Sequence, residues 1–354
     1  MKILAINPGS TSTKVALFDN TAPLLELTLR HSAEELSAFR SVMDQFDFRK
    51  RLILDALSES RIDIRSLDAV IGRGGLVRPI PSGVYEVNDA LERDLRHSPV
   101  GEHASNLGGL IAREIAREAG ARAFIADPVV VDELQPVARV CGLPSAERIS
   151  IFHALNQKAI ARAYAKKAGR KYEEMNLVVA HLGGGISVGA HRLGEVIDVN
   201  NALDGDGPLS PERAGSIPSA ALADLCFSGR YTRTEVEKML CGRGGLVALL
   251  GTNDTREAVS RLERGDEKAR IAMEAMCYGV AKWIGAMAVV LGGKADAIIL
   301  TGGIAHSQWV CHRITEQVSF LAPVVVMAGE NELEALASNA LRVMNGEEEA
   351  KVYR

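Results

Sequence analysis

Two parts of the chain repeat one pattern of apolar and polar positions. An apolar run, a polar turn and an alternating run occupy residues 4–18, and the same succession returns at residues 177–188. The apolar runs predict buried strands, and the alternating runs predict the return arms of hairpins. A third strand is expected after each hairpin, at 24–29 and 195–199. The chain therefore contains two β-β-β units about half a chain apart.

Helices and short buried strands follow each β-β-β unit. Buried strands are predicted at 69–71, 123–126, 297–300 and 324–327, and helices at 33–60, 104–119, 153–167, 267–291 and 333–344. The order β-β-β-α-β-α-β-α, seen twice, predicts an α/β protein of two duplicated domains with mixed sheets. We place the domains at 1–152 and 153–330, with residues 331–354 packing back on the first as a helix and its solvated tail. Ligands of such sheets bind at strand ends, in the cleft between the halves.

Composition and charge restrict the partners. The 354 residues are 47% hydrophobic and 24% charged, with a net charge of −4. This balance is that of an ordinary globular protein, and with 5% aromatic residues it argues against nucleic-acid binding and against an anionic membrane surface. The most apolar run, 280–291, contains Lys282 and is interpreted as a buried helix rather than a membrane span. Five cysteines without a CxxC pair indicate a reduced, cytoplasmic setting.

The two turns carry residues that suit a phosphate. Small residues let the backbone approach closely, and hydroxyl and N–H groups can bind phosphate oxygens. The residues concerned are Asn7, Ser10, Ser12 and Lys14 in the first turn and Gly183, Gly184 and Gly185 in the second. The alternative is a pair of tight turns with solvated polar groups. Two such hairpins predict a polyphosphate cleft, and hence an enzyme that moves the terminal phosphoryl group of ATP.

Several charged residues stand at predicted strand ends. Arg73 lies between glycines after a buried strand, where its planar guanidinium suits a carboxylate or a phosphoryl group. The same run recurs at 242–247 after a helical segment and is interpreted there as structural. Asp127 ends a strand before Pro128, either as a turn former or as a carboxylate that positions Mg²⁺. Gly302 and Gly303, between a strand and a helix, suit close approach of the nucleotide's sugar and base.

These motifs resemble the acetate and butyrate kinases, a family of the sugar kinase, heat-shock chaperone and actin superfamily. Residues 4–14 and 177–194 are similar to the two signatures of that family, and further similarities lie at 71–75, 126–130, 151–154 and 301–304. Residues 201–215 and 329–336 resemble the butyrate branch. The resemblance implies two actin-like, ribonuclease H-like domains with mixed sheets and a cleft between them.

The resemblance also implies roles for the residues. Asn7 would hold Mg²⁺ or its water, while Ser10, Ser12 and Lys14 would bind phosphate. Arg73 would contact the acyl substrate and the transition state, and Asp127 would position the metal. A metal-linked glutamate is expected at Glu330 or Glu332, although both could be simple helix N-terminal charges. Acetate kinases carry a second arginine after the second hairpin. Residues 205–207 contain none here, and Arg213 is the nearest candidate.

Two histidines are candidate hydrogen-bond donors. A lone histidine is more often structural than catalytic, and a carboxylate nucleophile is ionised at neutral pH and needs no base. We therefore interpret His153 and His181 as donors to phosphoryl oxygens rather than phosphorylated intermediates. The remaining histidines are expected to be non-catalytic: His31, His97, His103, His191, His306 and His312.

The activity implied is reversible in-line transfer of the γ-phosphoryl group of MgATP to a short-chain fatty acid. Butyrate and butyryl phosphate are the expected pair, with ATP and ADP as the nucleotides. Acetate, propionate or isobutyrate are alternatives, because one methylene in an apolar pocket gives only about 10- to 200-fold discrimination. A phosphohydrolase or a nucleotide-switch protein of the same superfamily is a more distant alternative. The family forms homo-oligomers, and the apolar helix at 273–291 faces either a partner copy or the core.

Overall fold

The computed structural model describes residues 1–99, 101–204 and 206–354, which divide into two compact units. Unit 1 comprises 1–131 and 331–354, and unit 2 comprises 132–330. The sequence analysis placed the division near residue 152 instead. Residues 132–152 go with unit 2 because they bond to its third strand. The N–H of Gln135 donates to the carbonyl of Ile197 at 3.0 Å, and Arg148 pairs with Asp198 at 2.8 Å.

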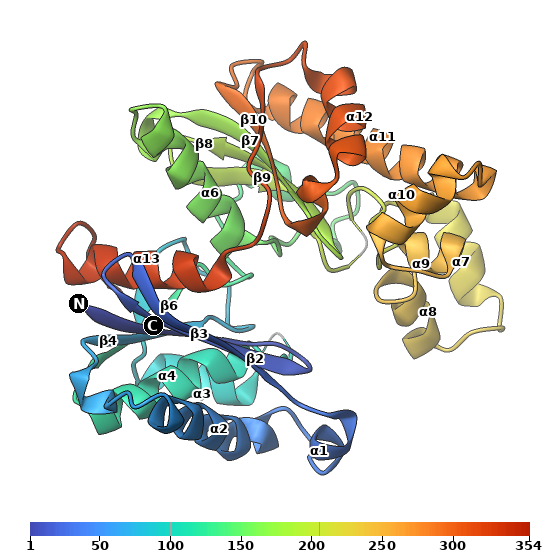
Figure 1. The fold of residues 1–354 in the computed structure, drawn as a ribbon. Coiled ribbons are helices and arrows are strands. Elements are labelled where there is room, and N and C mark those ends of the chain that lie inside the picture. The colour runs from blue at the N-terminus through green and yellow to red at the C-terminus, as the bar shows by residue number, and fades with distance from the viewer. Residues whose placement is uncertain (100, 205) are drawn as a thin grey trace. The chain divides into compact units, whose positions relative to one another are not determined.

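Unit 1 is a seven-stranded mixed sheet with helices on both faces (Figure 1). Its strands are β1 (Lys2–Pro8), β2 (Ser12–Asp19), β3 (Ala22–Arg30), β4 (Ala69–Arg73), β5 (Val84–Glu86), β6 (Arg122–Ala126) and β12 (Lys351–Val352). Its helices are α1 (Ala33–Ser37), η1 (Met43–Gln45), α2 (Phe46–Glu59), η2 (Ile64–Ser66), α3 (Asp89–His97), α4 (Asn106–Ala119) and α13 (Glu332–Met344). Leu4 and Ile6 of β1 share a buried core with α2, α3 and α4, while α13 packs on the other face.

Unit 2 is a five-stranded mixed sheet, also covered on both faces (Figure 1). Its strands are β7 (Asn176–Leu182), β8 (Ile186–Arg192), β9 (Glu195–Val199), β10 (Ala297–Thr301) and β11 (Val324–Val326). Its helices are α5 (Pro136–Arg139), α6 (Ala154–Lys167), η3 (Tyr172–Glu174), α7 (Ser219–Phe227), α8 (Arg233–Leu240), α9 (Gly245–Leu250), α10 (Thr255–Glu263), α11 (Glu267–Val290), η4 (Gly303–His306) and α12 (Gln308–Val318). Val178 and Ala180 pack with α11 and α12, and Leu177 and Val179 with α6.

The duplication that the sequence predicts is confirmed by the strand order. In unit 1 the order β3-β2-β1-β4-β6 has two antiparallel pairs followed by two parallel pairs. In unit 2 the order β9-β8-β7-β10-β11 has the same succession. Strands β5 and β12 extend the sheet of unit 1 beyond β6. The fold is therefore two actin-like α/β units.

Two local expectations are wrong. The helical stretch expected at 33–60 is broken into α1, η1 and α2. The chain end, expected to be solvated, adds β12 beside β5, and Tyr353 is buried with its hydroxyl donating to Asp94 at 2.6 Å. The chain end is held in place because the ring of Tyr353 packs at the edge of the core of unit 1. The polar residues next to Tyr353 in the sequence do not predict this burial.

Helix α11 is long and apolar enough to cross a membrane by length and composition. One side of it, including Met273, Val280 and Ile284, is buried in the core of unit 2. An apolar helix with one side packed on a sheet is what the core of an α/β unit requires. We therefore interpret α11 as the central core helix of this unit, which is one of the two interpretations that the sequence left open.

Glycines let α4 approach the backbone of β4. A Cβ atom on Gly108 would lie 2.5 Å from the carbonyl oxygen of Arg73, whereas one on Gly285 in the middle of α11 would meet nothing within 4 Å. Gly108→Ala should therefore lower the free energy of unfolding by about 1–3 kcal/mol through overpacking. Gly285→Ala should raise it by about 0.5–1 kcal/mol, because alanine favours helix. Chemical denaturation of both variants measures these changes. If the free energy of unfolding changed in the same direction in both variants, the packing argument would be contradicted.

Candidate active site

Unit 1 brings three predicted residues into one cluster. Asn7 is the penultimate residue of β1 and Arg73 ends the neighbouring parallel strand β4, so both lie at the same edge of the sheet. Glu332 begins α13 and joins them: its carboxylate accepts from Asn7 Nδ2 at 2.5 Å and pairs with Arg73 Nη1 at 2.9 Å. Arg73 Nη1 also approaches Asn7 Oδ1 at 3.5 Å. A guanidinium and an amide thus share one carboxylate.

The first turn lies at the same end of β1. Lys14 is exposed and directly opposite Asn7 in the hairpin register, so the two side chains share a face. Ser10 is exposed and Ser12 half-buried. The N–H of Gly9 donates to the Ser12 carbonyl at 2.7 Å and closes the turn. The sequence-predicted turn residues are therefore accessible to a ligand.

Asp127 stands just after β6, next to β4. Its backbone has a φ of 40°, an unusual value for a residue with a side chain. The carboxylate is buried and accepts from Ser82 Oγ at 2.6 Å and from the N–H of Gly83 at 2.9 Å. These two donors hold it in one position, which fits an oxygen ligand that must be in place before a metal or its water binds.

His103 is a residue whose setting sequence analysis missed. It belongs to the loop before α4, and its Nδ1 lies 2.8 Å from Ser105 Oγ. Desolvation by neighbouring atoms, and then the positive charge of Arg73, lower the pKa of His103. A neutral imidazole is thus placed near the proposed substrate arginine. A single histidine in a Gly- and Ser-containing loop gave no pattern to reveal this.

In unit 2, His153 and His181 lie face to face. Their ring centroids are 3.8 Å apart and the planes differ by 11°. His181 Nδ1 lies 2.7 Å from Asn156 Oδ1, and its Nε2 lies 3.1 Å from Glu330 Oε1. Both ring nitrogens of His181 therefore face acceptors. Each ring comes from a different element, since His181 belongs to β7 and His153 precedes α6.

A buried chain of hydrogen bonds orients His153. Gln157 Nε2 lies 3.1 Å from the carbonyl oxygen of Ser187, which fixes the amide with its nitrogen on that side. The same nitrogen donates to Ser187 Oγ at 2.8 Å, and Ser187 Oγ lies 2.8 Å from His153 Nδ1. The serine proton is then available to the ring nitrogen. This arrangement places the proton of a neutral His153 on Nε2, where it can be donated.

The chain continues behind Gln157 to His191 and Tyr172. Gln157 Oε1 accepts from His191 Nε2 at 2.9 Å, and the Tyr172 hydroxyl lies 2.7 Å from His191 Nδ1. Burial, followed by the charges of Lys158 and Arg162, lowers the pKa of His191 well below its usual value. His191 is therefore neutral, with its proton on Nε2. The sequence predicts that His191 is non-catalytic, and in the structure it supports the orientation of His153 through Gln157.

Arg213 packs against the glycine turn of unit 2. A Cβ atom on Gly185 would lie 1.0 Å from Arg213 Nη1, so the guanidinium occupies the space that a side chain there would fill. Its Nε and Nη1 are buried and have no hydrogen-bond partner among the described residues. Buried guanidinium nitrogens with unmet donors beside a phosphate-type turn fit an anionic ligand. Gly205, in the stretch lacking an arginine, lies outside the described residues.

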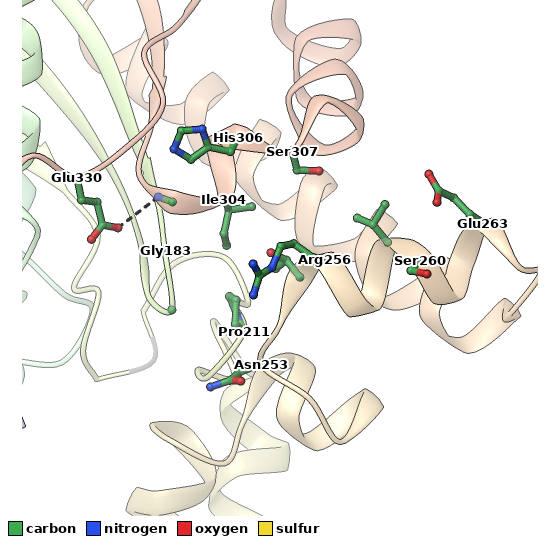
Figure 2. A pocket seen from close by; sticks show the side chains of 14 residues that line it. Gly183, Pro211, Asn253, Arg256, Ser260, Glu263, Ile304, His306, Ser307 and Glu330 are labelled. Carbon is green, nitrogen blue, oxygen red and sulfur yellow. Dashed lines mark hydrogen bonds between the residues drawn. The ribbon is translucent and has the colours of Figure 1, made fainter. Parts of the chain in front are cut away.

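Glu330 and Glu332 belong to different units. Glu330 accepts from the N–H of Gly303 at 3.3 Å (Figure 2). It also contacts His181, so both of its partners belong to unit 2. Gly302 has a φ of 88°, and a Cβ there would lie 2.4 Å from the Leu182 carbonyl. Glycine at 302 thus keeps β10 and β7 close where the nucleotide is expected.

A pocket of about 670 Å³ opens beside Gly183 and Gly303 in unit 2 (Figure 2). Sequence analysis found its glycines and Glu330 but not its other wall, which α10 provides with Arg256, Ser260 and Glu263. Figure 2 shows Arg256 extending from α10 toward Pro211. Arg256 is held by Asp254 through two side-chain contacts of 3.0 and 2.8 Å, and these bonds lower the pKa of Asp254 to about 2. The volume suits a nucleoside.

The duplicated sheets with their turns define the actin-like class of α/β fold. Solved structures with this fold include the acetate kinase of Porphyromonas gingivalis, with a TM-score of 0.79 and 18% identity over 97% of this chain and 99% of that one. A propionate kinase of Francisella tularensis subsp. tularensis has a TM-score of 0.76 and 20% identity over 95% and 98%.

The sequence comparisons identify the family. The family model described as "Acetokinase family" matches residues 148–350. Butyrate kinases 1 and 2 of Clostridium acetobutylicum are 54% and 53% identical over 353 residues, which is 100% of this chain and 99% of each relative. The chain belongs to the acetokinase family. It is accordingly a kinase that acts on a carboxyl group.

The neutral state of His191 predicts a pH dependence of stability. Because its pKa is lowered in the folded state, the unfolded chain binds the extra proton first as pH falls below about 6.5. Stability should therefore fall between about pH 6.5 and pH 5, by up to about 1.4 kcal/mol per pH unit from this group. His191→Gln should make that slope shallower, and the exposed His312→Gln serves as the control. Identical slopes of unfolding free energy against pH in wild type and His191→Gln would contradict this assignment.

Proposed function

We propose that this chain is a butyrate kinase that transfers the γ-phosphoryl group of MgATP to butyrate and reverses the reaction. The two Clostridium acetobutylicum relatives that carry that name support the choice of acid. The structural observation that carries the proposal is Arg213, a half-buried arginine beside the Gly183–Gly185 turn whose buried Nε and Nη1 have no acceptor among the described residues. Such a group has the charge and geometry to bind a transferring phosphoryl group.

In the proposed reaction, a carboxylate oxygen of butyrate attacks the γ-phosphorus in line. The new P–O bond forms as the bond to the ADP oxygen breaks, and no proton changes place. Because the transition state is loose and its charge lies on the equatorial oxygens, positioning and positive charge dominate catalysis. We assign this charge and hydrogen bonding to Lys14, Arg73, His153, His181 and Arg213. Arg73 also orients the butyrate carboxylate.

The nucleotide is assigned to the turns and the unit 2 pocket. Ser10, Ser12 and the Gly183–Gly185 turn would bind phosphates, while Gly302 and Gly303 would lie against the sugar and base. The guanidinium of Arg256, fixed by Asp254, offers a flat surface for the base. Acyl phosphates hydrolyse readily, so exclusion of water from the reacting groups would preserve the product.

Mg²⁺ is the proposed metal. Asn7, Asp127 and Glu332 offer only oxygen donors, the type that Mg²⁺ prefers. The described residues contain no cluster of three or more His, Cys, Asp or Glu able to hold a metal alone. This fits an ion bound by one or two protein oxygens together with nucleotide phosphates. We assign the metal-linked glutamate to Glu332, since it bonds Asn7, whereas Glu330 bonds His181. When bound, Mg²⁺ neutralises charge on the phosphates.

We further propose a cytoplasmic homo-oligomer. All five cysteines are free, which fits a reduced compartment. On the outer side of α11, Ile271, Tyr278 and Val289 have exposed fractions of 56%, 59% and 77%. Apolar side chains repeated along one helix are typical of a surface that a partner copy covers.

The substrate assignment is tested with hydroxylamine trapping of acyl phosphates. Purified protein, MgATP and each acid from acetate to valerate, including isobutyrate, should give most acyl hydroxamate with butyrate. Acids one methylene shorter or longer should react about 10- to 200-fold less efficiently. A maximum at another acid would transfer the assignment to that acid. ATP loss without hydroxamate from any acid would overturn the kinase proposal in favour of hydrolysis.

The role of Arg213 is tested by Arg213→Met. Loss of the guanidinium should lower kcat about 10³-fold or more, by analogy with other arginines that bind a transferring phosphoryl group. The free energy of unfolding should stay equal or rise by about 1 kcal/mol, because a buried group with unmet donors is removed. The control is Arg243→Met, since Arg243 is exposed in the repeated Gly-Arg-Gly-Gly run. A folded Arg213→Met variant with wild-type kcat would remove Arg213 from the mechanism.

A further inference from the structure

Arg49 lies buried directly behind the first turn. It belongs to the first turn of α2 and is 1% exposed. Its Nη1 donates to the carbonyl of Gly9 at 2.8 Å and to that of Ser12 at 3.2 Å, and its Nη2 donates to the carbonyl of Ser10 at 3.2 Å. One guanidinium therefore binds three carbonyl groups of a turn only four residues long.

These bonds decide which way the turn faces. The remaining carbonyl, of Thr11, accepts from the N–H of His31 at 2.9 Å, so every carbonyl from Gly9 to Ser12 has a donor within unit 1. Among the described residues, the N–H groups of Ser10 and Thr11 have no acceptor. A turn whose carbonyls are all bonded within the unit, and which keeps N–H groups without an acceptor, is suited to bind an anion.

The charge of Arg49 is not neutralised by the chain. Its remaining side-chain partners are neutral: Gln45 Oε1 accepts at 3.0 Å from Nε and at 2.8 Å from Nη2, and Thr13 Oγ1 accepts at 3.1 Å. No ion pair of Arg49 occurs among the described residues. Thr13 Oγ1 also contacts His31 Nε2 at 2.9 Å, and burial together with Arg49 lowers the pKa of His31. A buried cation without an acid partner is unusual, because such charges are normally paired.

We propose that Arg49 is a positioning residue for phosphate binding: its guanidinium holds the Gly9–Ser12 turn, and its unpaired charge attracts the nucleotide phosphates bound there. The inference rests on the proposed function, which makes this turn a phosphate site. The cation acts through the turn and does not touch the substrate. Its counter-charge is supplied by the bound nucleotide, which is why the neutral Gln45 rather than a glutamate supports it.

Gln45→Glu separates the charge from the geometry. A glutamate at 45 has the same shape and keeps both acceptor contacts, so Arg49 should stay in place and the melting temperature should not fall. The new ion pair should neutralise Arg49 and weaken binding of MgADP, measured by isothermal titration calorimetry, about tenfold. Gln45→Met removes the acceptor without adding charge and should bind within about threefold of wild type. Gln317→Glu on α12 controls for one added negative charge.

The outcomes are distinct. Wild-type MgADP affinity in folded Gln45→Glu, or equal weakening in Gln45→Met, would overturn the proposed role of the charge. If Gln45→Glu does not fold, Arg49→Lys and Arg49→Met make the same comparison, and the lysine variant should bind about tenfold more tightly. Equal affinities of that pair would overturn the inference. Because the binding assay needs no acid, a wrong choice of butyrate leaves it intact. A wild type that binds no nucleotide would overturn the proposed function and this inference together.

Discussion

The parallel pairing of each hairpin's first strand with the next strand along the chain is the constraint on which the candidate site depends. In unit 1, β1 beside β4 brings Asn7 and Arg73 to one edge. In unit 2, β7 beside β10 places His181 opposite Thr301, next to Gly302. Residues separated by more than 60 positions meet because parallel strands end at the same edge. The same geometry in both units explains why each carries its polar turn at that edge.

Two arginines close to the polar turns, Arg213 and Arg49, lower the free energy of unfolding, and the rest of each unit must offset this cost. Arg213 has unmet donors, and Arg49 has no acid partner among the residues described. A buried cation is normally paired because desolvation is expensive. Each unit has an apolar core whose stabilisation can offset a few kcal/mol of local cost. A positive charge without an acid partner, next to a turn with unbonded N–H groups, has a use where an anion binds. The positions of Arg213 and Arg49 therefore indicate function, because stability alone does not explain them.

Periodic features of the fold were predictable from sequence, and isolated ones were not. The two β-β-β units and α11 have long, regular patterns, and both were found where they were expected. Strand β5 has three residues, and its partner β12 has two. Both are too short to show the alternation of apolar and polar residues that predicts a strand. At the candidate site, turn composition is what predicts roles for Ser10 and Gly183. Arg49 lies in an ordinary charged helix, and only the tertiary structure shows that its side chain points inward beneath a turn.

The two glutamates of the 330–332 segment divide the candidate phosphate-binding groups into two kinds. Glu330 bonds His181 in unit 2, and Glu332 bonds Arg73 in unit 1. A phosphate that binds either of these groups must compete with a carboxylate of the chain, so its binding there is an exchange of one anion for another. Arg213 and Arg49 have no such competitor among the described residues. In the proposed reaction their charge would act on a phosphate without displacing such a bond, Arg213 directly and Arg49 through the turn, whereas Arg73 and His181 would first have to release a carboxylate.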